Sequence, residues 1–325
     1  MSSTIRIVKD IDECEFLLQK YYPVECLFDL WWVKETFAKV YKREPFFVVH
    51  EDGSRLDGLL PLCRASELII SDNGSLFKKE FYLFFPGEMW HNRTWMEQNK
   101  IIATNFDVMR EMLLVVKSEA DNGGSFVDIR YLNKKSVENI PSEFSSNCTV
   151  DEVGYIFYPA QYKYSYEAYL GSFAGKSRKK ILSEIATLEG HGVSFRYNNF
   201  DDLNIMFELN MNSFGSNGYF HDSRFLNSFI ELASQLNKNG MLRVVTVIIG
   251  GKVAAVDMGC VWNNQSIMLA GGTDRNFAGV AKLINLHHIK WACAQKLESL
   301  DFLCGDFGWK GRFHLTPREL YQIVF

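Results

Sequence analysis

Apolar residues in the first half of the chain follow two periods, one typical of strands and one typical of helices. Apolar runs at 46–50 and 56–63 flank a polar turn, Glu51-Asp52-Gly53-Ser54, which favours a β-hairpin. The remaining expected strands lie at 5–8, 68–71, 76–85 and 126–130, and the expected helices at 12–21, 29–41 and 107–119. The pattern predicts helices and mostly antiparallel strands.

The second half repeats this alternation with clearer boundaries. A helical segment at 176–189 stops at a glycine pair, and a three-strand meander turns at Gly250-Gly251 and Asn263-Asn264, two tight-turn dipeptides. The expected strands are 153–158, 193–197, 242–249, 252–261, 265–272, 300–304 and 320–325, and the expected helices are 166–173, 176–189, 201–213, 222–237 and 280–297. Strands and helices again share one sheet-based unit.

The two halves echo each other weakly. The hairpin at 46–62 resembles the hairpin at 242–259, and each is followed by an amphipathic helix and a short strand. The polar stretch 133–150 reads as a surface connection, and a chain of 325 residues has room for two domains. We therefore expect an α/β (α+β) fold with two domains, 1–150 and 151–325, each a mixed, mostly antiparallel sheet flanked by helices.

Composition narrows the function classes. The net charge of −4 and a pI near 6.0 argue against a general nucleic-acid binder. Seven scattered cysteines form no Cys-x-x-Cys pair, so neither a disulfide scaffold nor a metal framework is expected. The first residues lack an apolar signal core, and no apolar run is long enough for a membrane span. These features predict a cytoplasmic protein without a membrane span.

The first candidate site is the turn between the strand at 265–272 and the helix at 280–297. A strand–turn–helix junction with small residues directs backbone N–H groups and the positive end of a helix dipole at one point, which suits a phosphate. The expected anion-binding residues are Gly271, Arg275, Asn276, Phe277, Ala278, Gly279, Val280 and Ala281. The alternative is a turn that needs Gly279 for its own geometry, and neither GxGxxG nor GxxxxGK[ST] is present.

The second candidate is a basic cluster in the first turn of the helix expected at 176–189. Lys176, Arg178, Lys179 and Lys180 lie where the helix dipole disfavours cations. An anionic ligand such as a CoA 3′-phosphate, a nucleotide-linked sugar or an RNA backbone would offset that cost. The alternative is a solvated charged helix face.

The third candidate is the glycine-rich loop 305–312, which follows the strand at 300–304. Asp306 could orient or deprotonate an amine, Lys310 could hold an anionic group or a developing oxyanion, and Trp309 and Arg312 could contact substrate. The alternative is a structural ion pair of Asp306 with Lys310 or Arg312. His287 and His288 lie within the helix at 280–297 without metal-ligand spacing, one expected toward the core and one toward solvent.

Together these residues give the chain a resemblance to the GNAT-superfamily acyltransferases. It is closest to the cellulose-biosynthesis-type acetyltransferase branch, which is related to the Fem peptidyltransferases. The features that carry the resemblance are Trp31-Trp32, Gly58-Leu59-Leu60-Pro61-Leu62, Phe173 with the basic cluster, Gly251-Lys252-Val253-Ala254-Ala255, Gly279 before a long helix, and Gly305-Asp306 followed by Trp309-Lys310. Asn276 departs from the Gln or Arg usual at that position.

The resemblance implies tandem GNAT-like domains, with a degenerate first domain and an acyl-CoA site in the second. The expected enzyme is an N-acyltransferase that moves an acetyl or longer group from acetyl-CoA or another acyl-CoA to an amine, without a metal. The acceptor would be a small molecule, glycan or peptide, including cell-envelope precursors. Two alternatives stay open, a Fem-like peptidyltransferase that uses aminoacyl-tRNA and a non-catalytic binding protein of the same fold. The oligomeric state is not predicted.

Overall fold

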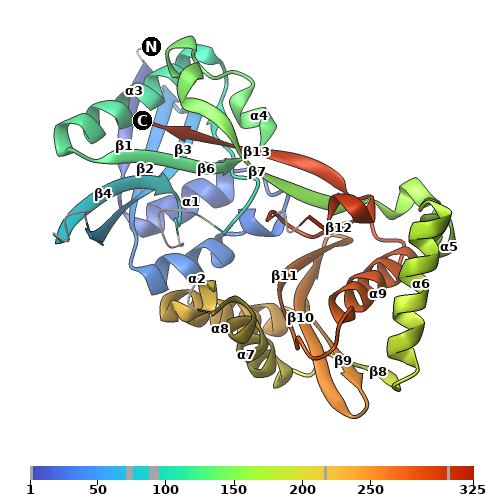
Figure 1. Ribbon diagram of the computed structural model, residues 1–325. Helices are drawn as coiled ribbons and strands as arrows, with labels where there is room; N and C mark the ends of the chain where they lie inside the picture. Colours follow the sequence, from blue (N-terminus) through green and yellow to red (C-terminus); the bar gives the residue numbers. More distant parts are fainter. Residues whose placement is uncertain (1–2, 71–75, 88–94, 216–217, 306–307) are drawn as a thin grey trace. The chain divides into compact units, whose positions relative to one another are not determined.

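The computed structural model describes residues 3–70, 76–87, 95–215, 218–305 and 308–325, and it divides into two compact units (Figure 1). Unit 1 comprises Met1–Val153 and Glu319–Phe325, and unit 2 comprises Gly154–Arg318. The expected second domain ran to residue 325, whereas β13 (Thr316–Val324) carries the chain end into unit 1. Leu320 and Ile323 are fully buried on that strand, so the last residues complete the core of unit 1.

Unit 1 is a mixed sheet with helices on both faces. Its elements are β1 (Ser3–Val8), α1 (Ile11–Tyr21), α2 (Trp31–Tyr41), β2 (Glu44–Asp52), β3 (Arg55–Ile70), β4 (Leu76–Phe84), β5 (Ile102–Ala103), α3 (Phe106–Gly123), β6 (Phe126–Leu132) and α4 (Lys134–Val137). The strand order is β1-β2-β3-β4-β6-β13, with β5 beside β3. Of the pairs whose register is known, only β4–β6 is parallel.

Helix α3 covers one face of this sheet closely because a glycine lies beneath it. A Cβ added to Gly58 would lie 2.6 Å from Val108 Cγ1 of α3, so any side chain there would push the helix away. On the other face, Phe47 of β2 and Trp31 of α2 both pack on Phe85, with ring centroids 5.3 and 5.7 Å away. The strand residues of unit 1 therefore alternate between two apolar layers.

Unit 2 repeats this plan. Its elements are β7 (Cys148–Phe157, which begins in unit 1), α5 (Tyr166–Gly171), α6 (Gly175–Glu189), β8 (Val193–Tyr197), α7 (Asp202–Phe214), α8 (Ser223–Lys238), β9 (Leu242–Ile249), β10 (Lys252–Trp262), β11 (Gln265–Thr273), α9 (Val280–Ala294) and β12 (Ser299–Asp301). The strand order is β7-β12-β11-β10-β9-β8. Helices α6 and α9 lie on one face of the sheet, and α7 and α8 lie on the other (Figure 1).

The two units share one order of elements: strand, two helices, three strands, helix, strand. In unit 1 this order runs from β1 through α1, α2 and α3 to β6, and in unit 2 from β8 through α7, α8 and α9 to β12. The matching strand orders confirm the expectation of two related α/β halves. Both expected turns of the meander are also present, since Gly250, Gly251, Asn263 and Asn264 all have positive φ.

Three boundaries differ from the sequence expectation. The stretch 133–150, expected to be a surface connection, contains α4, a 3-10 turn at Ser142–Asn147 and the start of β7. Helix α9 ends at Ala294 and not at residue 297, because Lys296 takes a left-handed φ of 52° that an α-helix does not continue through. The strand expected at 68–71 is, as far as it is described, the end of β3.

Candidate functional site

The turn between β11 and α9 exposes several backbone amides at the beginning of a helix. Asp274 folds the turn on itself, since its carboxylate accepts from the amide of Asn276 at 2.9 Å and its carbonyl accepts from the amide of Phe277 at 3.1 Å. The amide of Val280 donates to the Phe277 carbonyl, also at 3.1 Å. Gly279 is the N-cap, with φ 91°, a conformation that L side chains rarely adopt.

Four backbone N–H groups at the beginning of α9 are available to bind a ligand. Among the described residues, the N–H groups of Ala278, Gly279, Ala281 and Lys282 have no hydrogen-bond partner, and no side chain caps the helix. Ala278, Gly279 and Ala281 are exposed. The first turn contains no acidic residue, so the positive end of the helix dipole is not neutralised locally. The arrangement fits a phosphate or pyrophosphate.

The strand that leads to this turn has one open edge. β11 pairs with β12 only through Gln265–Ile267, and beyond Ile267 its pairing in the described chain is with β10 alone. The two parallel strands therefore separate just before the amide-lined turn. A β-bulge lies in this region, because Met258 and Gly259 of β10 face Ala270 and Met268, and Leu269 has no opposite residue.

Helix α7 holds the separated part of β11 from the other face. Asn210 donates to the Gly271 carbonyl at 2.7 Å, and Ser213 donates to the Thr273 carbonyl at 3.2 Å. A Cβ added to Gly272 would lie 2.4 Å from the carbonyl oxygen of Met206, so glycine is required for this close approach. The open edge is thus fixed in place by α7.

A buried polar chain, which the sequence did not single out, lies beside Gly271. Asp257 Oδ2 is 3.0 Å from His288 Nε2, and Arg243 Nη1 is 2.7 Å from His288 Nδ1. The other oxygen of Asp257 occupies the space where a Gly271 Cβ would be, 2.2 Å from the ideal position. Burial lowers the pKa of His288, so a neutral ring donates to Asp257 and accepts from Arg243.

The signal for this chain was present in the sequence. Arg243 and Asp257 are charged residues within otherwise apolar strands, and both lie on the face that meets α9. His288 fulfils the expectation of a core histidine, since it is 1% exposed, while His287 is half-buried against Phe195. A charged side chain in a buried strand is costly unless it is paired, so such residues indicate an ion pair or a functional site.

The predicted anion-binding residues differ in whether their amides are available to a ligand. The amides of Ala278, Gly279 and Ala281 lie together at the start of α9 without partners among the described residues. The amide of Lys282, which was not predicted, lies with them. The amides of Asn276, Phe277 and Val280 are already engaged within the turn. Arg275 is exposed, and its guanidinium donates to the Ser213 carbonyl.

The basic cluster Lys176–Lys180 lies away from this point. Glu184 of α6 pairs with Lys282 of α9, and Leu188 lies 3.7 Å from a Cβ added to Gly279, so the two helices run antiparallel. Lys176 precedes Leu188 by 12 residues, or roughly 18 Å of helix. Lys176, Arg178, Lys179 and Lys180 are exposed at the end of α6 opposite the α9 amides. The structure does not bring the two candidate sites together.

The lysine of the glycine-rich loop after β12 binds the loop's own backbone. Asp306 lies outside the described residues. Lys310 is 2% exposed, and its ammonium donates to the carbonyls of Phe302, Leu303 and Cys304 at 2.8, 2.8 and 2.7 Å. Those bonds use all three donors of an ammonium. These bonds anchor the loop to the end of β12, and the catalytic role of Lys310 stays a prediction.

The two remaining loop residues are also held by the loop or the core. Trp309 packs edge-on against Phe302 and Phe313, with ring centroids 5.5 and 5.2 Å away. Arg312 is exposed and donates to the Gly308 carbonyl at 2.6 Å. No group of His, Cys, Asp or Glu in the described residues could hold a metal ion. None of the helices described is long and apolar enough to cross a membrane.

The corresponding place in unit 1 is closed by the chain itself. The start of α3 is capped, since Asn105 Oδ1 accepts from the amide of Val108 at 3.0 Å. Residues 96–101 lie beside β6. The backbone amide of Asn99 donates to the Tyr131 carbonyl at 2.9 Å, and the backbone carbonyl of Asn99 accepts from the amide of Asn133, also at 2.9 Å. This segment occupies the edge of β6 beyond its pairing with β4.

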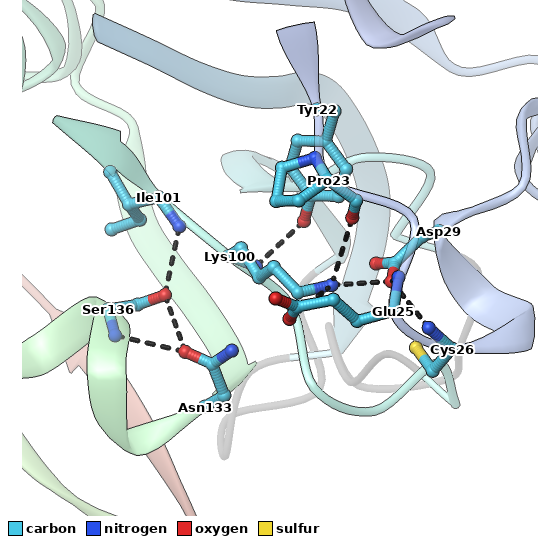
Figure 2. Close-up of polar contacts among 9 residues, drawn as sticks. All are labelled: Tyr22, Pro23, Glu25, Cys26, Asp29, Lys100, Ile101, Asn133 and Ser136. Atoms are coloured by element: carbon cyan, nitrogen blue, oxygen red, sulfur yellow. Dashed lines mark hydrogen bonds and ion pairs between the residues drawn. The ribbon is translucent and has the colours of Figure 1, made fainter.

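A buried ion pair holds that segment in place. Lys100 Nζ lies 2.5 Å from Asp29 Oδ2, and the amide of Lys100 donates to the Tyr22 hydroxyl at 2.8 Å (Figure 2). The amide of Ile101 donates to the Ser136 hydroxyl at 3.0 Å. Lys100 and Asp29 are each 4% exposed. Unit 1 thus has no opening equivalent to the β11 edge in its described residues.

Comparisons with known proteins agree with this architecture. Residues 175–311 match the family model described as an acetyltransferase (GNAT) domain. The chain is similar in structure to FemX (TM-score 0.57, 11% identity, covering 100% of this chain and 98% of FemX). It is also similar to the L-PGS of Bacillus licheniformis (TM-score 0.53, 9% identity, 98% and 92% covered).

A third similar structure is a tandem GNAT protein from the clavulanic acid biosynthesis pathway (TM-score 0.51, 9% identity, covering 99% of this chain and 98% of that protein). Among curated proteins, none matches the sequence. The expected fold class is confirmed, while the narrower cellulose-biosynthesis branch stays a prediction. Residues 175–311 are therefore similar in sequence to a GNAT acetyltransferase domain, and the chain has the fold of tandem GNAT domains.

Proposed function

We propose that unit 2 is the catalytic domain of an acyl-CoA-dependent N-acyltransferase, and that unit 1 is a degenerate copy of it. The observation that carries this proposal is the set of four amides without described partners, at Ala278, Gly279, Ala281 and Lys282, beside the open edge of β11. The pyrophosphate of the donor would accept from these amides. Their geometry fits because Gly279 presents no side chain toward the ligand.

The open edge of β11 supports a path for the thioester. A donor that enters between β11 and β12 would run along Met268–Thr273, which has no strand neighbour on that side in the described chain. The bulge at Leu269 leaves an amide outside the regular ladder, and such an amide is suited to polarise the thioester carbonyl. Holding the amine and the carbonyl in one geometry would supply much of the acceleration.

The reaction requires one proton acceptor. The amine nitrogen bonds to the carbonyl carbon, the carbon–sulfur bond breaks, CoA leaves as its thiol or thiolate, and a base takes the amine proton. Asp306 stays a prediction for this role. Asp257 is the second candidate, since its carboxylate lies against Gly271 and is held by His288.

Thermal unfolding with a series of donors tests the proposal. A ligand at about 100 times its Kd stabilises the folded state by about 2.7 kcal/mol. We expect acetyl-CoA or a longer acyl-CoA to raise the Tm, and free CoA to do so as well because it carries the same pyrophosphate. Release of CoA in the presence of an amine library then separates an enzyme from a binding protein. No Tm shift with any donor would overturn the assignment.

A second candidate function is aminoacyl transfer from a charged tRNA, as the resemblance to the Fem peptidyltransferases implies. The specific observation that favours it is the exposed basic cluster of α6, comprising Lys176, Arg178, Lys179 and Lys180, at the end away from the α9 amides. Binding of total tRNA at two salt concentrations tests it, since phosphate contacts weaken steeply with salt. A Tm shift with tRNA and none with any CoA compound would favour this second function.

The finer expectations belong to the same proposal. An acceptor amine on a small molecule, a glycan or a peptide would approach the thioester at the open edge of β11. A cytoplasmic location and a cell-envelope acceptor stay predictions. Identification of acyl-CoA that copurifies with the protein, by mass spectrometry, would fix the chain length of the donor.

A further inference from the structure

A cavity in unit 2 lies apart from the α9 amides. It has a volume of about 440 Å³ and opens between the end of β8, the start of β9, the end of β10 and the second half of α9. Its walls include Tyr197, Arg243, His287 and Trp291. Trp291 follows Gly279 by 12 residues, or roughly 18 Å along α9, so the cavity and the proposed donor site are separate.

One cationic side chain of this cavity has unused hydrogen-bonding capacity. Arg243 is 8% exposed, and its Nη1 is engaged by His288 at 2.7 Å. Its Nη2 is buried without a hydrogen-bond partner among the described residues. The guanidinium carbon lies 3.8 Å from the centroid of the Trp291 ring. Leaving a buried charged donor unsatisfied is unfavourable, and an anionic acceptor would relieve it.

The charge of Arg243 is only remotely balanced. Asp257, the carboxylate that faces it, is separated from it by the neutral His288 ring, which contacts both. Burial lowers the pKa of Arg243 to about 10, in the direction expected for a cation short of direct anionic partners. Arg243 lines the cavity, so an anion there would lie beside this cation.

The walls around Arg243 are flat and largely apolar. His287 stacks on Phe195 with ring centroids 4.0 Å apart, and its Nε2 is 3.3 Å from the Tyr197 hydroxyl. Burial lowers the pKa of His287 to about 4, so at neutral pH this ring is an uncharged wall. Among the described lining residues, Arg243 is the one with a permanent charge. A single cation with planar walls suits one carboxylate on a flat body better than a phosphate, which prefers several donors.

We propose that this cavity binds a small monocarboxylate with a planar apolar body, its carboxylate on Arg243 and its ring beside Tyr197 and His287. The site is independent of the donor site, and it gives unit 2 a second ligand besides an acyl-CoA. The cavity volume lies within the range of small-molecule sites, about 300–1,000 Å³.

Binding of benzoate and of its neutral isostere benzamide to the full chain tests the proposal, by calorimetry and ligand-observed NMR. We expect benzoate to bind at least about tenfold more tightly than benzamide, a difference of about 1.4 kcal/mol. Arg243→Met should abolish that preference. Arg224→Met is the control, because Arg224 lies on α8, pairs with Asp222 near the surface and does not line the cavity.

Two further measurements keep the result decisive. If Arg243→Met does not fold, Tyr197→Ala at a 52% exposed position should weaken benzoate binding while preserving the fold. Benzoate should also bind equally with and without saturating CoA. Equal binding of benzoate and benzamide, no binding of either, an unchanged Arg243→Met variant, or competition with CoA would each overturn the proposal. None of these outcomes depends on whether the protein transfers acyl groups.

Discussion

Unit 1 and unit 2 have the same order of strands and helices, yet the same position is closed in one and open in the other. In unit 2 the last strands separate beyond Ile267, and α9 begins with amides that have no described partner. In unit 1 the start of α3 is capped by Asn105, and residues 96–101 lie along β6. Because the topology is shared, the difference in chemistry comes from local satisfaction of backbone groups. A GNAT-like fold alone does not make a donor site.

The largest expected effect is on the closed unit. Lys100→Met would leave the Asp29 carboxylate buried without its cation, and breaking a buried pair from one side destabilises by about 3–5 kcal/mol. We expect that loss in the free energy of unfolding, measured by urea denaturation. Lys117→Met, at the exposed pair with Asp121, is the control and should change stability by less than about 1 kcal/mol. A small loss for Lys100→Met would show that the segment is not held by this pair.

The next effect is on the open unit. Gly279→Val adds a β-branched side chain at φ 91° beside the four amides, so CoA binding should weaken by about 100-fold, or about 2.7 kcal/mol. Gly251→Val is the matched control. It places the same side chain at φ 80° in a turn with open space around it, so it should share the backbone strain but retain CoA binding. Equal CoA affinity in the two variants would refute the amide assignment.

A smaller effect is expected at the cap that closes unit 1. Asn105→Ala removes the side chain that accepts from Val108, and loss of such a cap lowers stability by about 1 kcal/mol. We expect a corresponding fall in Tm with no change in CoA affinity. Appearance of a second CoA-binding event in this variant would show that capping alone closes the site, and would shift the explanation away from residues 96–101.

The smallest expected change in CoA affinity is for variants of the basic cluster. Changing Lys176, Arg178 and Lys179 together to Gln should leave CoA affinity within about twofold, because the cluster lies at the opposite end of α6 from Gly279. The same variant should reduce the salt-dependent binding of tRNA if the second candidate function is correct. A large loss of CoA affinity would place the cluster within the donor site and contradict the antiparallel arrangement of α6 and α9.

Local features of the fold were predictable because their causes are local. The turns at Gly250-Gly251 and Asn263-Asn264 require positive φ, which those residues tolerate, and the strands of the meander follow from their apolar runs. The position of β13 was not predictable, because its pairing with β6 joins residues nearly 200 positions apart. A terminal apolar strand indicates that it pairs, but not with which partner.

The location of the candidate site was predictable from the sequence, but the residues that form it were not. Glycine spacing identified the start of α9, whereas the pairing of Asp274 with two amides of the turn decides which N–H groups remain, and that depends on the folded geometry. Lys310 was expected to contact substrate because it is cationic in a glycine-rich loop. In the structure its ammonium donates to three carbonyls of the chain after β12. Sequence alone does not distinguish a cation that binds a ligand from one that binds its own backbone.

The central claim is that the amides at the start of α9, and not those at the start of α3, hold an anionic donor. A titration of the 15N-labelled chain with CoA, followed by amide chemical shifts, tests it most directly. We predict downfield shifts for Ala278, Gly279, Ala281 and Lys282, and no shift for Val108, whose amide is already bound by Asn105. Shifts confined to α3 or to the first turn of α6, with none at Gly279, would contradict it.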